Sequence, residues 1–201
     1  MKNIIPFALL LSFFLLGNSL AAEEKCEYDY DSSKTTLEWT AFKFTEKTGV
    51  KGSIQKVDVK KTKRSSSVIE TLKNLKFVAF SDSVNSNNPD RDAKIKTYFF
   101  GSVKEIKGHF TNIVVSPTGG TAVLKLELNK KKESIPVTYT ISENTVILKG
   151  TLDVLKFGMG SGIQKLNEVC SDLHKGADGK SILWPTVDFQ VTSTLLKECK
   201  P

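Results

Sequence analysis

Polar and apolar residues alternate along most of the chain beyond residue 30. In the segment 35–44, Leu37, Trp39 and Ala41 fall on one face, and Glu38 and Thr40 fall on the other. A period of two residues is typical of a β-strand that buries one face. Six later segments repeat this alternation, and an apolar run at 77–84 adds one more, so the pattern predicts eight strands. The six segments are 50–60, 106–115, 121–128, 134–141, 146–157 and 187–196.

The connections between the later strands are short and carry turn residues. The segments 117–120 and 129–133 and the pair Glu143-Asn144 contain Gly, Pro, Asn or charged residues that favour turns. Connections of this length join antiparallel strands, because a parallel pair needs a long crossover. Eight antiparallel strands need covered edges, and a closed barrel covers them while leaving an interior that side chains or one apolar ligand can fill. The sequence therefore predicts an all-β, eight-stranded antiparallel barrel, with a two-sheet sandwich as the alternative.

Three segments depart from the alternation and are predicted to be short helices in the connections. They are 65–73, 90–100 and 161–175. The third places Ile163, Leu166, Cys170 and Leu173 on one stripe, which predicts that this stripe is buried. The sequence holds no internal repeat and no linker, so residues 22–201 are expected to form a single domain.

The first 21 residues have the pattern of a secretory signal peptide. Lys2 gives a positive start, the thirteen residues 4–16 are nearly all apolar, and small residues lead to Ala21. Thirteen apolar residues are fewer than the roughly 20 that span a bilayer. The sequence therefore predicts cleavage after Ala21 and export of the mature domain to a periplasm.

Three cysteines remain after that cleavage, so one intramolecular disulfide can form. If the barrel closes, its first and last strands are antiparallel neighbours, which places Cys26 beside Cys199. This predicts a Cys26–Cys199 bridge and leaves Cys170 as a buried free thiol. A Cys170–Cys199 bridge is the alternative.

The composition offers little for catalysis or metal binding. His109 and His174 are the only histidines, and with three scattered cysteines they do not have the spacing of a metal site. The protein is therefore predicted not to be an enzyme; the alternative is an enzyme acting on a lipid headgroup, with His109 beside Glu105 or Asp188.

The chain is basic, with 29 Lys and Arg residues against 22 Asp and Glu residues. The basic runs 60–64 and 130–132 fall at predicted turns and have no interleaved aromatic residues, so nucleic acid is not expected as a partner. Transient contact with an anionic membrane surface is the interaction that this charge favours.

Short motifs follow one another through the middle of the chain: Ser83-Val84-Asn85-Ser86, Arg91-Asp92, Ile95 and Phe99-Phe100. This series resembles the signature of the YceI-like, lipocalin-like polyisoprenoid-binding proteins. The resemblance extends over nearly the whole mature chain, with further matches at 37–41, Gly52, 126–129, 135–137 and 150–158. The chain departs from the family pattern at Lys43, where many members have His, and at 87–90, which replaces a His-rich stretch.

The resemblance implies a periplasmic lipocalin-like barrel that sequesters or carries an amphipathic lipid, such as an isoprenoid, an isoprenoid quinone or a fatty-acid-like lipid. It implies a carrier or store with no cofactor, and it makes Arg91 and Asp92 the family's matched pair. An Arg-Asp pair at a helix start is predicted to be a structural clamp, with a headgroup ligand as the alternative. The alternative is a periplasmic interaction protein, with its barrel filled by side chains and a basic docking face; a homodimer is also considered.

The strand faces and the resemblance together give a predicted ligand-binding set. It consists of the inward-facing residues of the barrel, with Phe99 and Phe100 near a mouth. The set is Leu37, Trp39, Phe99, Phe100, Leu124, Leu126, Val137, Tyr139, Leu152, Val154, Phe157 and Phe189.

Overall fold

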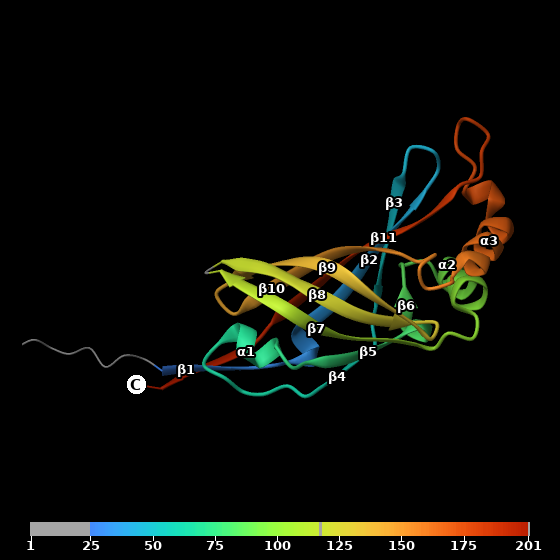
Figure 1. Ribbon diagram of the computed structural model, residues 1–201. Helices are drawn as coiled ribbons and strands as arrows, with labels where there is room; N and C mark the ends of the chain where they lie inside the picture. Colours follow the sequence, from blue (N-terminus) through green and yellow to red (C-terminus); the bar gives the residue numbers. More distant parts are fainter. Residues whose placement is uncertain (1–24, 117, 201) are drawn as a thin grey trace, which may run out of the picture.

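The alternating segments form one strongly curled antiparallel sheet (Figure 1). The computed structural model describes residues 25–116 and 118–200. Ten strands make up this sheet, and β1 (Lys25–Asp29) pairs with β12 (Leu196–Lys200) in a separate two-stranded ribbon. Across the large sheet the order is β4 (Val57–Lys60), β5 (Lys76–Phe80), β7 (Glu105–Ser116), β8 (Gly119–Leu128), β9 (Lys131–Ser142), β10 (Thr145–Asp153), β11 (Leu183–Thr194), β2 (Thr35–Lys43), β3 (Thr48–Ile54) and β6 (Val84–Asn85).

The two ends of this sheet meet and close it. Gln55 and Lys56 alone separate β3 from β4, and the short 3-10 turn η2 (Ser81–Ser83) separates β5 from β6. The Gln55 amide donates to the Ser83 carbonyl at 3.1 Å, and the Phe80 amide donates to the Lys56 carbonyl at 3.0 Å. The β3–β4 and β5–β6 segments therefore lie side by side from Ser53 to Lys60, and the sheet encloses an interior.

The predicted all-β antiparallel barrel with short connecting helices is confirmed, but the predicted strand count is wrong. The predicted strands 50–60 and 77–84 each contain a break. Ser83 causes both breaks, because its hydroxyl accepts the Lys56 amide at 2.9 Å in place of a backbone carbonyl and donates to the Phe80 carbonyl at 2.7 Å. The ribbon of β1 and β12 is a further addition to the prediction.

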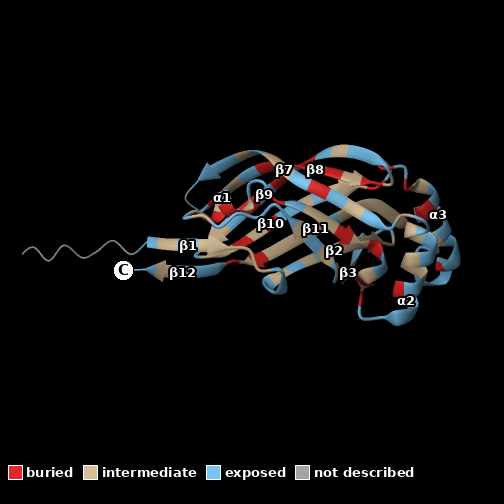
Figure 2. Ribbon diagram, turned by 90° about the horizontal axis from the view of Figure 1, so that it is seen from below, coloured by how far each residue is buried: buried red, intermediate tan, exposed pale blue. Residues whose placement is uncertain are grey.

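The core lies along the inward faces of the central strands (Figure 2). On β8, Leu124, Leu126 and Leu128 are each at most 4% exposed, while the residues between them face outward. The inward residues of β9 and β10 continue the same layer. Each strand thus contributes alternate side chains to the interior, as its sequence predicts.

The helices cover the two ends of the barrel (Figure 1). Helix α1 (Val68–Leu72) lies at the end from which the β1–β12 ribbon extends, and its N-cap Ser67 accepts the Glu70 amide. Helix α2 (Pro89–Lys94), the π-helix η3 (Ile95–Phe100) and helix α3 (Gly160–Val169) lie at the opposite end. None of the helices in the described ranges is both long and apolar enough to cross a membrane.

The third helix is shorter than its sequence predicts. It ends at Val169, with Cys170 as its C-cap, and the 3-10 turn η4 (Ser171–Leu173) follows. The predicted buried stripe therefore stops at Cys170, which is 7% exposed, whereas Leu173 is 62% exposed. The expectation that Leu173 is buried is wrong, because the turn rotates it away from the barrel.

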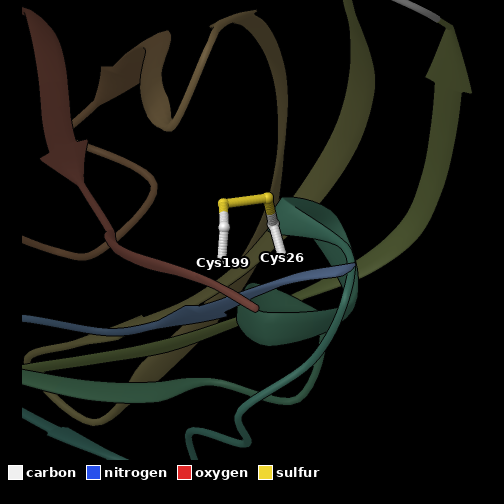
Figure 3. Close-up of a disulfide and its surroundings, with 2 residues drawn as sticks. All are labelled: Cys26 and Cys199. Carbon is white, nitrogen blue, oxygen red and sulfur yellow. A yellow bond between two sulfur atoms is a disulfide. The ribbon is translucent and has the colours of Figure 1, made fainter. Parts of the chain in front are cut away.

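The disulfide joins the two strands of the terminal ribbon (Figure 3). Cys26 and Cys199 are direct partners in the β1–β12 register, so the predicted bridge is confirmed. Cys170 is a buried free thiol, which makes the alternative Cys170–Cys199 bridge wrong. The predicted signal peptide, residues 1–21, lies outside the described residues.

The ribbon is fastened to the barrel as well as to itself. The Arg64 guanidinium forms ion pairs with Glu27 on β1, at 2.9 Å, and with Glu198 on β12. The Tyr28 amide donates to the Ser65 carbonyl at 2.7 Å. These contacts hold the ribbon against the segment that leads into α1.

The disulfide is expected to stabilise the fold strongly, because it closes a loop of 173 residues. Cys26→Ser should lower the free energy of unfolding by about 5 kcal/mol if loop entropy accounts for the effect. Urea denaturation of both proteins would measure this change. Cys170→Ala is the control, since it removes a thiol and keeps the bridge. Equal stability of Cys26→Ser and the parent protein would contradict the prediction.

Candidate ligand-binding cavity

The barrel encloses a cavity of about 270 Å³ along its axis. Leu72 of α1 lines it at one end, and Ile163 and Leu166 of α3 line it at the other. Since α1 and α3 lie at opposite ends of the barrel, the cavity runs along the length of the fold (Figure 1). Such an elongated space suits a chain-like ligand better than a compact one.

The lining of the cavity is almost wholly apolar. Of the described side chains around it, none is charged, and the hydroxyl groups come from Tyr30, Thr35 and Ser193. The indole nitrogens of the two lining tryptophans bond to the backbone, Trp39 to the Ser53 carbonyl at 3.2 Å and Trp184 to the Phe44 carbonyl at 2.7 Å. Both tryptophans therefore have satisfied donors and offer the cavity apolar ring surface.

Nine of the twelve predicted ligand-binding residues line this cavity. They are Leu37, Trp39, Phe99, Phe100, Leu124, Leu126, Leu152, Val154 and Phe189. Their contact with a ligand stays a prediction. The alternation of the strands placed most of them, because residues two apart share a face of the sheet.

Val137, Tyr139 and Phe157 are buried in the core but are not among the residues around the cavity, and their contact with a ligand stays a prediction. No described residue of β9 lines it. Val137 packs beneath Gly150 of β10, and the Tyr139 hydroxyl donates to the Val114 carbonyl at 3.0 Å near the tip of β7. Phe157 is 1% exposed within the turn before α3. The alternation of polar and apolar residues shows which side chains face the interior. It does not show which of these line the cavity and which lie behind other side chains.

Three aromatic rings of the wall lie across glycines of the neighbouring strands. In the register, Trp39 is opposite Gly52, Phe77 opposite Gly108, and Phe189 opposite Gly150. A Cβ at Gly52 would lie 2.2 Å from the Trp39 ring, and one at Gly108 or Gly150 would lie 2.6 Å from its ring. The glycines thus let each ring lie flat against the sheet instead of reaching across the cavity.

Phe99 and Phe100 close the end that α2 and α3 cover. They lie on the π-helix η3, and their ring centroids are 4.9 Å apart in an edge-to-face arrangement. Helix α3 packs directly on this turn, because a Cβ at Gly162 would lie 2.4 Å from the Phe99 carbonyl oxygen. The Gly-rich start of α3 therefore serves close packing against η3.

Arg91 and Asp92 both bind Ser86, which anchors α2 to the sheet edge. The Ser86 amide and hydroxyl donate to Asp92 Oδ1, the amide at 2.9 Å. Arg91 donates from Nε to the Ser86 hydroxyl at 2.7 Å and from Nη2 to the Ser86 carbonyl at 2.6 Å. Asp92 is 8% exposed, so its carboxylate is buried with these donors. The two side chains meet at a shared serine outside the cavity.

The residues considered for an enzyme lie on the outer wall. His109 is exposed on β7 between Lys76 and Lys125 on the neighbouring strands, and Glu105 pairs with Lys107 at 2.6 Å. Asp188 is exposed and accepts from the Thr151 hydroxyl at 2.6 Å.

His174 also lies away from the cavity lining. Its Nδ1 is 2.9 Å from the Asn167 amide oxygen. Burial, together with Lys43 and Lys94, lowers the pKa of its imidazole. Within the described ranges, no three His, Cys, Asp or Glu side chains gather as metal ligands.

The sequence did not single out several residues that line the cavity. Ile54, Val57, Ile106 and Phe110 share the inward faces of their strands, so alternation could have found them. Phe77 also lines the cavity, but it lies in a run with apolar residues on both faces, where alternation does not show the inward side. The polar residues Thr35 and Ser193 have the same parity as Leu37 and Val191, but their polarity excluded them from a search for apolar positions.

Comparison with known proteins places this fold. A family described as the YceI-like domain matches residues 28–176. A polyisoprenoid binding domain from Saccharophagus degradans, implicated in plant cell wall breakdown, superposes with a TM-score of 0.56 at 14% identity, over 89% of this chain and 100% of that one.

BcnA from Burkholderia cenocepacia superposes with a TM-score of 0.57 at 15% identity, over 84% of this chain and 99% of that one. No curated protein matches the sequence. At these identities the two structures establish the shared fold alone.

Gly162→Ala should disturb the end of the cavity, because the new Cβ would meet the Phe99 carbonyl. Such overpacking costs about 1–3 kcal/mol, which urea denaturation would measure. Gly160→Ala is the matched control in the same helix, since its Cβ would lie 3.4 Å from Leu155, an ordinary contact. If both variants were equally stable, the packing of α3 on η3 would not limit this site.

Asp92→Ala should loosen α2, because the Ser86 amide and hydroxyl would lose their acceptor. Leaving buried donors unsatisfied costs about 1–3 kcal/mol. The exposed Asp90 in the same turn provides the control Asp90→Ala. Thermal unfolding of the two variants would show a lower Tm for Asp92→Ala only, and equal shifts would speak against the anchor.

Proposed function

The chain belongs to the YceI-like family, and on that basis we propose that it binds an isoprenoid or similar amphipathic lipid inside the barrel and carries or stores it. The observation that supports this best is the continuous, uncharged and apolar cavity between α1 and α3. The similar Saccharophagus degradans structure is a polyisoprenoid binding domain, which supports the same ligand class.

Burial of an apolar chain supplies the driving force for such binding. Each methylene group that leaves water for an apolar surrounding contributes about 0.8 kcal/mol. The described walls present hydrocarbon and ring surface along the whole axis, so a chain gains contact over its length. Side chains that lie flat over glycines give it room.

We propose that the protein acts by binding and not by catalysis. The candidate acid–base residues His109 and Asp188 are exposed on the outer wall, away from the cavity lining. A lipid inside the barrel would therefore not contact them. Release and uptake of the ligand would be the functional steps.

Export to the periplasm is part of the proposal. Residues 1–21 have the composition of a signal peptide, and the Cys26–Cys199 disulfide suits an oxidising compartment. The exposed residues Lys60, Lys61 and Lys63 next to α1 would attract an anionic membrane surface, and this attraction would weaken as salt rises. A homodimer stays a prediction, which sedimentation of the purified protein would measure.

The direct test is native mass spectrometry of the protein purified from the periplasm of its own host, followed by organic extraction. A stoichiometric lipid adduct is the expected result. A bare polypeptide mass, together with failure to take up added geranylgeraniol, would overturn the proposal and favour an interaction protein.

A cavity-filling variant would test where the lipid binds. Ala41→Phe places a ring in the cavity that Ala41 lines, and it should lower geranylgeraniol affinity at least about tenfold because the chain loses its space. Thr40→Phe puts the same ring outside, since neighbouring residues of a strand face opposite sides.

Leu126→Arg would bury a charge in the same cavity and should abolish uptake or folding. Unchanged affinity of a folded Ala41→Phe variant would place the lipid elsewhere.

A further inference from the structure

Three hydroxyl groups gather at one end of the apolar cavity. Thr35 begins β2, Ser193 lies next to the end of β11, and the two are direct partners in the sheet register. Their side-chain oxygens are 2.8 Å apart, and Ser193 is only 5% exposed. Tyr30 precedes them in the chain and lines the cavity beside them. This is the end at which α1 lies and from which the terminal ribbon extends (Figure 2).

The protons of this cluster can be assigned from its partners. Thr35 Oγ1 is also 3.1 Å from the Asp31 carbonyl, which can only accept, so the Thr35 hydroxyl donates there. Ser193 is then the donor in its contact with Thr35, and its lone pairs remain available. The Tyr30 phenol lies within reach of the Thr35 hydroxyl, so it belongs to the same cluster. Burial raises the pKa of Tyr30, with the Thr35 hydroxyl acting in the opposite direction, so the phenol keeps its proton.

The cluster therefore offers the Tyr30 hydroxyl, which can turn from Thr35 to donate to a ligand, and the Ser193 oxygen, which can accept, in a cavity whose described lining carries no charge. A phosphate or carboxylate buried here would lose its hydration and find no cation, because no Lys, Arg or His belongs to the described lining. An uncharged hydroxyl or carbonyl group would lose less hydration free energy and could form hydrogen bonds with the cluster. Selection against a charged headgroup thus follows from the lining itself.

We propose that the cavity selects amphiphiles with an uncharged oxygen headgroup, an alcohol or a carbonyl, which binds at Tyr30, Thr35 and Ser193 while the chain runs toward Phe99 and Phe100. This inference rests on the proposed function and adds the headgroup class and the direction of the ligand. Charged lipids such as prenyl diphosphates and fatty acids are then excluded from the buried site.

The experiment compares probes that share a chain and differ in headgroup. Delipidated full-length mature protein with its disulfide intact is titrated with geranylgeraniol, geranylgeranyl diphosphate and phytane, the saturated hydrocarbon with the same branched carbon skeleton. Tryptophan fluorescence reports binding, because Trp39 and Trp184 line the cavity. Geranylgeraniol should bind most tightly, and farnesylacetone, a ketone, should bind more tightly than farnesyl diphosphate.

Hydroxyl-deleting variants locate the headgroup. Ser193→Ala and Tyr30→Phe should each weaken geranylgeraniol binding about two- to tenfold, the effect of one hydrogen bond. Thr35→Val should weaken it in the same range because it removes the partner that positions Ser193, and all three variants should leave phytane binding unchanged. The control is Thr194→Val. Thr194 forms an equivalent cross-strand hydroxyl pair with Thr145, at 2.9 Å, but neither residue lines the cavity.

The outcomes separate this inference from the proposed function. If the protein binds none of the probes, the proposed function itself is wrong. If it binds them but the three variants keep the same preference as Thr194→Val, the headgroup does not bind at this cluster and the inference is overturned. Tighter binding of the diphosphate than of the alcohol would also overturn it.

Discussion

The closure of the sheet at Ser83 is the interaction on which the rest of the fold depends. A curled sheet with open ends would expose backbone donors along β4 and β6, and its interior would fill with solvent. Hydrogen bonds from Gln55 and Lys56 to Ser83, and from Phe80 to Lys56, join these ends. Elsewhere in the same sheet β2 and β11 pair directly, and the terminal strands that extend from them pair in turn. The enclosed cavity depends on the closure at Ser83, and the position of the disulfide depends on the β2–β11 pairing.

A protein interior is usually packed as tightly as an organic crystal, so an open cavity needs a structural reason. In this barrel, Trp39, Phe77 and Phe189 lie over Gly52, Gly108 and Gly150 of the adjacent strands. The rings thereby lie against the sheet and leave the axis open. A side chain at any of the three glycines would push the ring opposite it toward the axis. Gly162 allows a similarly close approach, because the missing side chain lets α3 pack against the backbone of η3. Glycine placement sets the width of the cavity as much as the size of the apolar residues.

The sequence predicted those features that depend on periodicity and closure. Alternation placed Leu124 and Leu126 in the interior, and the neighbouring first and last strands placed Cys26 beside Cys199. The sequence did not predict a feature that one side chain determines. The Ser83 hydroxyl replaces a backbone acceptor and interrupts two strands, and the alternation gives no sign of this.

The alternation also could not predict whether an inward-facing side chain lines the cavity or lies behind other side chains. Val137 has the parity of a lining residue but lies under Gly150, and Ser193 lines the cavity although its residue type suggests the surface. The pairing of β9 with β10 determines the position of Val137, and the pairing of β11 with β2, which are far apart in the chain, determines that of Ser193. A period of two carries no information about either cross-strand contact.

The terminal disulfide also governs how the protein bears mechanical load. Residues 27–198 lie inside the covalent loop, so tension applied between the two ends of the chain passes through the sulfur atoms and bypasses the barrel. An attachment at either terminus could therefore be pulled without widening the cavity or releasing its contents.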